Sequence, residues 1–119
     1  MSKFAKNIAP FVDAELQQAE AAELSGQALL AFTHLERAHI LGQASTYQHV
    51  RVHLRMLGWG VRQRQPREIL GQLFRLVGAA TKTAIGFVPS GNTGGANVSA
   101  LKPMPIPQDL SAIIRQAQS

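Results

Sequence analysis

Apolar residues recur at intervals of three and four positions through residues 10–84, a spacing typical of amphipathic helices. This pattern predicts four helices, over residues 10–23, 26–41, 46–62 and 67–84. Pro10 is expected to open the first helix and Gly42 to end the second. Ser45 or Thr46 can cap the third helix, and Pro66 can start the fourth. We therefore predict an all-α fold in which two helical hairpins form a four-helix bundle.

The apolar stripes of the third and fourth helices are expected to face the bundle. They comprise Tyr47, Val50, Leu54, Leu57 and Val61 in the third helix, and Ile69, Leu70, Leu73, Phe74, Leu76 and Val77 in the fourth. His49 and His53 lie on the flank of the first of these stripes.

The character of the sequence changes after Gly86, where glycine and proline become frequent and a loop is predicted. Within it, SGNTGG resembles a phosphate-binding glycine loop but lacks the Gly-Lys-Ser/Thr ending. Its expected role is to permit positive φ and close backbone approach as the tail crosses the helices. Pro107 and Asp109 then introduce a short helix over 108–117, expected to dock on the bundle, so residues 1–119 are predicted to form one domain.

Composition excludes several classes of site. The chain has 119 residues, no cysteine, 45% hydrophobic and 16% charged residues. Disulfides, thiolate metal sites and a cysteine nucleophile are therefore excluded. No apolar stretch approaches the roughly 20 residues of a membrane span, and no signal-peptide pattern follows the start, so we expect a cytoplasmic protein without membrane insertion.

The net charge of +5 is unevenly distributed, because residues 11–36 are acidic and residues 37–82 are basic. The basic set comprises Arg51, Arg55, Arg62, Arg64 and Arg67. It is either a phosphate-binding face or a set of ion-pair partners for the acidic first segment. We favour ion pairing and do not expect nucleic-acid binding, because exposed aromatic residues do not alternate with these arginines.

All four histidines fall within twenty residues, and two pairs share helix faces. Glu36 and His39 are separated by three positions, and His49 and His53 by four. A hairpin turn near Ala44 would place these two pairs at the same level along two neighbouring antiparallel helices. The spacing predicts a metal site made of Glu36, His39, His49 and His53, with Zn²⁺ or another divalent transition metal as the ion.

His34 points about 140° away from His39 on a helical wheel and is expected to be peripheral. The competing interpretation for each histidine is an ordinary hydrogen-bonded side chain, buried or at the surface.

Small residues seven positions apart, Ala31 with Ala38 and Gly71 with Gly78, permit close helix approach. The stretch GQALLAFTHLERAHIL resembles the second half of a tetratricopeptide unit. This resemblance implies tetratricopeptide-like hairpins and an alternative function as an interaction module that binds a peptide or a second copy of the chain.

Four motifs together cover almost the whole chain: HLERAHILGQ, HVRVHLRML, GFVPSGNTGG and PMPIP. They resemble a bacterial family of uncharacterised proteins, the domain of unknown function 3703. Members of that family occur near heavy-metal resistance genes, so the resemblance implies a metal-related role. Our leading expectation is a non-enzymatic metal-binding or metal-handling protein, and an enzyme that uses a bound metal is a smaller possibility.

Overall fold

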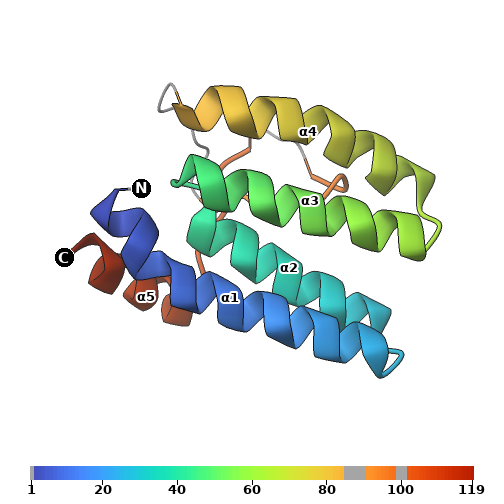
Figure 1. Cartoon of the computed structure of the whole chain (residues 1–119), viewed down its shortest axis with the longest axis horizontal. Coiled ribbons are helices and arrows are strands. Elements are labelled where there is room, and N and C mark those ends of the chain that lie inside the picture. The colour runs from blue at the N-terminus through green and yellow to red at the C-terminus, as the bar shows by residue number, and fades with distance from the viewer. Residues whose placement is uncertain (1, 85–90, 99–101) are drawn as a thin grey trace.

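The computed structural model describes residues 2–84, 91–98 and 102–119 and shows five α-helices, with no strand in those ranges (Figure 1). The helices are α1 (Lys3–Leu24), α2 (Ala28–Gly42), α3 (Thr46–Arg62), α4 (Pro66–Ala84) and α5 (Gln108–Gln118). The predicted all-α fold, with four long helices and a short C-terminal one, is confirmed.

The helices form two hairpins, α1 with α2 and α3 with α4, joined by packing of α2 against α3. The C-terminal helix α5 lies against α1 and α2 (Figure 1). Asn7 Nδ2 of α1 donates to the carbonyl of Ala117 at 3.0 Å, which fixes the end of α5 beside the start of α1. Between α4 and α5, the described part of the tail contacts α2 and α4: the Asn92 carbonyl accepts from His39, and the Gly94 carbonyl accepts from Gln72.

The first helix begins at Lys3, earlier than the predicted residue 10. Ser2 caps it, because its hydroxyl accepts from the Ala5 amide at 3.1 Å. Pro10 lies inside the helix and removes one backbone donor. Burial of Ala5 and Ile8 in the turns before it offsets that loss, which the periodic pattern after Pro10 did not show.

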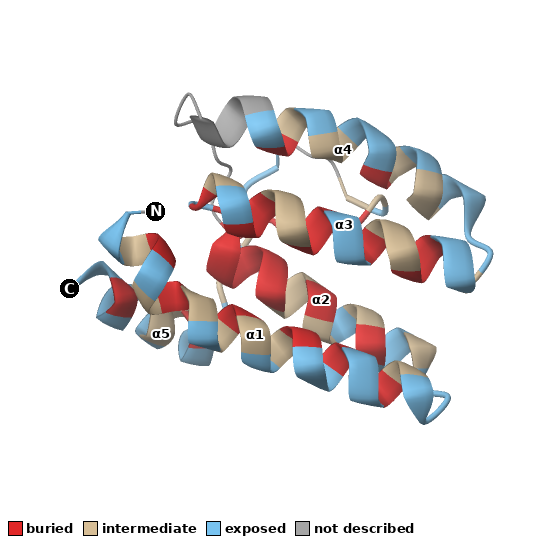
Figure 2. Ribbon diagram, in the orientation of Figure 1, coloured by how far each residue is buried: buried red, intermediate tan, exposed pale blue. Residues whose placement is uncertain are grey.

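The predicted core faces of α3 and α4 are wrong in part, because many of the predicted stripe residues are exposed (Figure 2). These exposed residues are Tyr47, Leu54 and Val61 of α3 and Leu70, Leu73, Phe74 and Val77 of α4. The sides that face inward carry polar residues among the apolar ones: His49 and His53 on α3, and Gln72 on α4. Hydrophobic periodicity misplaced these sides because the inward polar groups bond to one another and so tolerate burial.

Ion pairs connect the acidic first helix to the basic third one. Arg51 contacts Asp13 at 2.6 Å, and Arg62 contacts Glu23 at 2.6 Å. For these two arginines the structure agrees with the ion-pair interpretation. Among the described residues, no helix is both long and apolar enough to cross a bilayer.

Candidate metal centre: a buried histidine cluster

Three histidines meet where α2 ends and α3 begins. His39 lies in the last turn of α2, and His49 and His53 occupy successive turns of α3. The short connection requires close contact between the helix ends, since a Cβ on Gly42 would lie 2.8 Å from the Gln48 Cβ. Glycine at this position therefore lets α2 and α3 converge next to the histidines.

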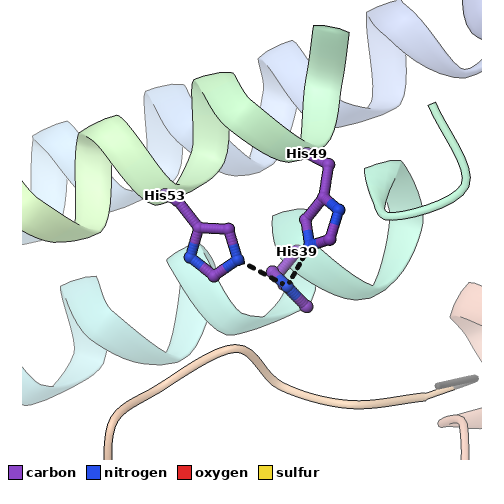
Figure 3. A group of neighbouring side chains, drawn as sticks. All are labelled: His39, His49 and His53. Carbon is purple, nitrogen blue, oxygen red and sulfur yellow. Dashed lines mark hydrogen bonds between the residues drawn. The ribbon is translucent and has the colours of Figure 1, made fainter. Parts of the chain in front are cut away.

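The three rings point their Nε2 atoms toward one another (Figure 3). Nε2 of His39 lies 3.0 Å from Nε2 of His49 and 3.1 Å from Nε2 of His53. One ligand atom from each ring lies within 4.8 Å of the others, and none of the three residues is more than 8% exposed. The cluster thus presents three nitrogen donors to one small buried volume.

The tautomer of His39 follows from its second ring nitrogen. Nδ1 lies 2.6 Å from the backbone carbonyl oxygen of Asn92, which can only accept a hydrogen bond. Nδ1 of His39 must therefore carry the proton and donate. In a neutral ring this leaves Nε2 with a lone pair.

The same reasoning applies to His53 through Gln72. The side-chain Nε2 of Gln72 donates to Glu68 at 2.6 Å and to the Gly94 carbonyl at 2.9 Å, which fixes the orientation of the amide. Its Oε1 therefore faces Nδ1 of His53, at 2.5 Å, and accepts from it. Nε2 of a neutral His53 consequently also carries a lone pair.

Two lone pairs thus face each other across 3.1 Å between His39 and His53. His49 can donate a proton toward His39, but among the described residues no donor lies between His39 and His53. Such a contact is favourable only when a cation or an added proton lies between the two atoms.

An added proton is unfavourable at neutral pH. Burial lowers the pKa of His39 well below its ordinary value, and the neighbouring His53 and His49 lower it further. Burial also lowers the pKa of His53, to about 4, although the bond to Gln72 opposes this shift. The rings of His39 and His53 are therefore neutral near pH 7, which is the form that binds metal ions.

Among the described residues, the cluster contains only histidines. The carboxylate of Glu36, predicted as the fourth ligand, lies outside the group. Burial raises the pKa of Glu36, and the charge of Glu68 raises it further. The predicted fourth ligand is therefore not part of the cluster that the structure forms.

His34 also lies apart from the cluster, in agreement with its expected peripheral position. Its Nδ1 is 2.7 Å from a carboxylate oxygen of Glu15, and the pair lies at the partly exposed junction of α1 and α2.

Part of the SGNTGG loop contacts the cluster directly; Ser90 lies outside the described residues. Gly91 and Gly94 have positive φ values of 77° and 84°, as expected for this segment. A Cβ on Gly94 would lie 2.4 Å from a ring carbon of His39. The loop therefore packs its backbone flat against this imidazole.

Replacing Gly94 with alanine should move either the loop or the His39 ring. We expect Gly94→Ala to destabilise the protein by at least about 1 kcal/mol, because it combines strain at positive φ with overpacking. Urea unfolding followed by circular dichroism measures this effect. Gly26→Ala is the control, because Gly26 has φ 82° and open space around it. Its effect on the free energy of unfolding measures the backbone strain alone. Equal losses at the two glycines would contradict contact with the His39 ring.

Sequence reasoning did not identify the groups that orient the histidines: Glu68, Gln72, Asn92 and Gly94. A signal for Gln72 was present, because it lies on the helical side shared by Ile69, Leu76 and Ala79, where an apolar residue is expected. Glu68, one turn earlier, is its natural partner. The Asn92 carbonyl is a backbone group in a loop, and the sequence pattern does not identify it.

The fold and the site together define a class of small all-α proteins with a buried three-histidine cluster between neighbouring helices. The family model described as "Protein of unknown function (DUF3703)" matches residues 6–114. The chain therefore belongs to this family. Searches of curated proteins and of solved structures found no match.

Proposed function

We propose that the protein is a non-enzymatic, cytoplasmic metal-binding or metal-handling protein that binds one divalent transition-metal ion through Nε2 of His39, His49 and His53. The observation that supports this function best is that Nε2 of His39 and Nε2 of His53 each direct a lone pair at the other. A metal ion converts their repulsion into two coordinate bonds.

The donor set and its dimensions suit Zn²⁺. Zinc binds histidine nitrogen at about 2.0–2.1 Å, which at a tetrahedral angle places two ligand nitrogens about 3.4 Å apart. The contacts of 3.0 and 3.1 Å reach this value with movements of a few tenths of an ångström. The third pair of donors, from His49 and His53, lies within 4.8 Å, and these two rings would turn toward each other around the ion. Cu²⁺, Ni²⁺, Co²⁺ and Fe²⁺ also accept imidazole ligands, and three histidines leave a further position on zinc for water or another ligand.

The groups around the cluster support the same proposal. Metal-binding histidines typically donate their other ring nitrogen to a carbonyl or a carboxylate, which fixes the ring and makes it more basic. His39 donates in this way to Asn92, and His53 donates to Gln72, which is bonded to Glu68. The nearby acids Glu36 and Glu68 would also offset part of the charge of a buried dication.

Metal analysis of protein purified without a histidine tag tests the proposal. The protein is first stripped with a chelator and then titrated with Zn²⁺, with calorimetry and thermal unfolding as readouts. We expect about one equivalent to bind and the unfolding temperature to rise, because the ion binds the folded state preferentially. Substitution with Co²⁺ adds a visible spectrum that reports the coordination geometry.

The result that would overturn the proposal is equally specific. Less than about a tenth of an equivalent bound, with no thermal shift on addition of Zn²⁺, Ni²⁺, Cu²⁺ or Co²⁺, would identify the cluster as a structural element only. Zinc binding that persists unchanged after removal of His39 would place the ion elsewhere.

Gln72 should contribute to metal affinity without touching the ion. We expect Gln72→Met to weaken Zn²⁺ binding by about 10- to 100-fold, since loss of a group that orients a metal ligand has effects of that size. Competition with a chromophoric chelator measures the change. Gln63→Met, at a glutamine bonded to Glu23 and far from the cluster, is the matched control and should leave affinity unchanged. Equal affinity in both variants would contradict the role of Gln72.

A further inference from the structure

One face of α4 carries exposed apolar side chains along its middle turns. Phe74 is 83% exposed, and Leu70, Leu73 and Val77 are also exposed on the same side of the helix. Among the described helices, α4 packs only against α3, and Figure 2 shows its outward side largely exposed. We call Leu70, Leu73, Phe74 and Val77 the α4 face.

The area of this face exceeds what scattered surface residues explain. The exposed parts of the four side chains amount to about 550 Å², at the upper end of the range of roughly 300–600 Å² for the largest patches on monomers. Leu54 and Val61 of the neighbouring α3 are also exposed. Standard protein interfaces bury about 600–1,000 Å² on each partner, so the α4 face supplies most of the area that a small stable interface requires.

The spacing of the α4 face is self-complementary. Leu70 and Val77 are equally distant from a point between Leu73 and Phe74. When a second α4 packs antiparallel about a twofold axis through that point, Leu70 meets Val77 of the copy, and Leu73 meets Phe74 of the copy. The same patch then serves both partners, as a twofold interface requires. The alternation of three- and four-residue steps is the spacing that two packed helices use.

Charge favours the same orientation. The α4 face contains no charged residue, and Arg67 lies one turn before it. In an antiparallel pair, Arg67 lies beside Ala80 of the copy, near the helix C-terminus, where a positive charge is favourable. A parallel pair would instead place Arg67 against Arg67.

We propose that the protein forms a twofold-symmetric homodimer through antiparallel packing of the α4 face on a second copy. This interface lies on the outer side of the α3–α4 hairpin, and the histidine cluster lies on its inner side. Dimer formation therefore does not depend on metal binding.

Sedimentation of the untagged full chain in the presence of a chelator, at concentrations of about 1–100 μM, tests the proposal. We expect a dimer for the natural sequence and a monomer for Phe74→Glu, because like charges would then meet near the twofold axis. Leu29→Glu is the matched control, since Leu29 is 80% exposed on α2, outside the interface. It should remain dimeric, and circular dichroism should show equal helix content in all three proteins.

The absence of cysteine allows the orientation to be tested by cross-linking. Phe74→Cys should form an intermolecular disulfide readily, because both copies of residue 74 lie near the axis. Arg67→Cys should not pair with itself, since its two copies are about 20 Å apart at 1.5 Å per residue. A mixture of Arg67→Cys and Ala80→Cys should instead form the mixed disulfide.

A monomer at every concentration would overturn the proposal, and so would a dimer unchanged by Phe74→Glu. A monomer that instead binds anionic lipid vesicles through the same residues would assign the face to a membrane surface and would equally contradict self-association. Rapid self-pairing of Arg67→Cys would contradict the antiparallel orientation.

Discussion

Replacing His39 with alanine is expected to weaken Zn²⁺ binding by at least about 100-fold, which corresponds to about 2.7 kcal/mol. His39 is the one histidine whose Nε2 approaches both of the others. Its removal leaves two donors from a single helix and also removes the hydrogen bond to the Asn92 carbonyl. Calorimetric titration, or chelator competition if binding is too tight, measures the change.

His34→Ala is the matched control, because it removes a histidine from the same helix without touching the cluster. Its zinc affinity should equal that of the natural protein. Circular dichroism separates loss of affinity from loss of structure, and a His39→Ala protein that is folded and binds zinc normally would contradict the proposed site.

Mild acid is expected to destabilise the metal-free protein strongly. The pKa of His53 is about 4 in the folded state and 6.5 for an unperturbed side chain. Between these values the unfolded chain binds a proton that the folded chain does not, so stability falls as the pH decreases. For His53 alone the loss is roughly 2 kcal/mol by pH 5 and roughly 3 kcal/mol when complete, at 1.36 kcal/mol for each pKa unit. His39, whose pKa is also lowered, adds to the loss in the same direction.

Urea unfolding between about pH 7.5 and pH 5, in the presence of a chelator, measures this dependence. The free energy of unfolding should be nearly constant above pH 7 and should decrease below about pH 6.5. His53→Gln should flatten the curve because it removes one of the titrating groups. A curve that is flat down to pH 5 would contradict burial of neutral histidines.

Much of the fold follows from local pattern. Periodicity and capping residues predicted the all-α class and most helix boundaries, because these depend on neighbouring residues. The start of α1 was missed because Pro10 is a typical first residue of a helix and the sequence alone does not show how the preceding turns are buried. The inward sides of α3 and α4 were misplaced because they contain polar groups whose partners come from other helices.

For the candidate site, too, local spacing predicted some features, and contacts between distant residues determined the others. The spacing of His39, His49 and His53 predicted that two neighbouring helices bring their rings together, and the structure places them in contact. The spacing could not determine that the Glu36 carboxylate lies outside the cluster, because positions three apart on one helix do not fix where a side chain ends. Nor could it identify the Asn92 carbonyl, because that contact joins residues 53 positions apart in the chain.

The loop backbone that lies flat on the His39 ring has a kinetic consequence. The three rings are buried, and the backbone of Asn92 and Gly94 contacts His39. Departure of an ion held there would require displacement of this loop in addition to breakage of the coordinate bonds. Such a site is suited to long retention of an ion, and rapid transfer to another molecule would require an event that displaces the loop.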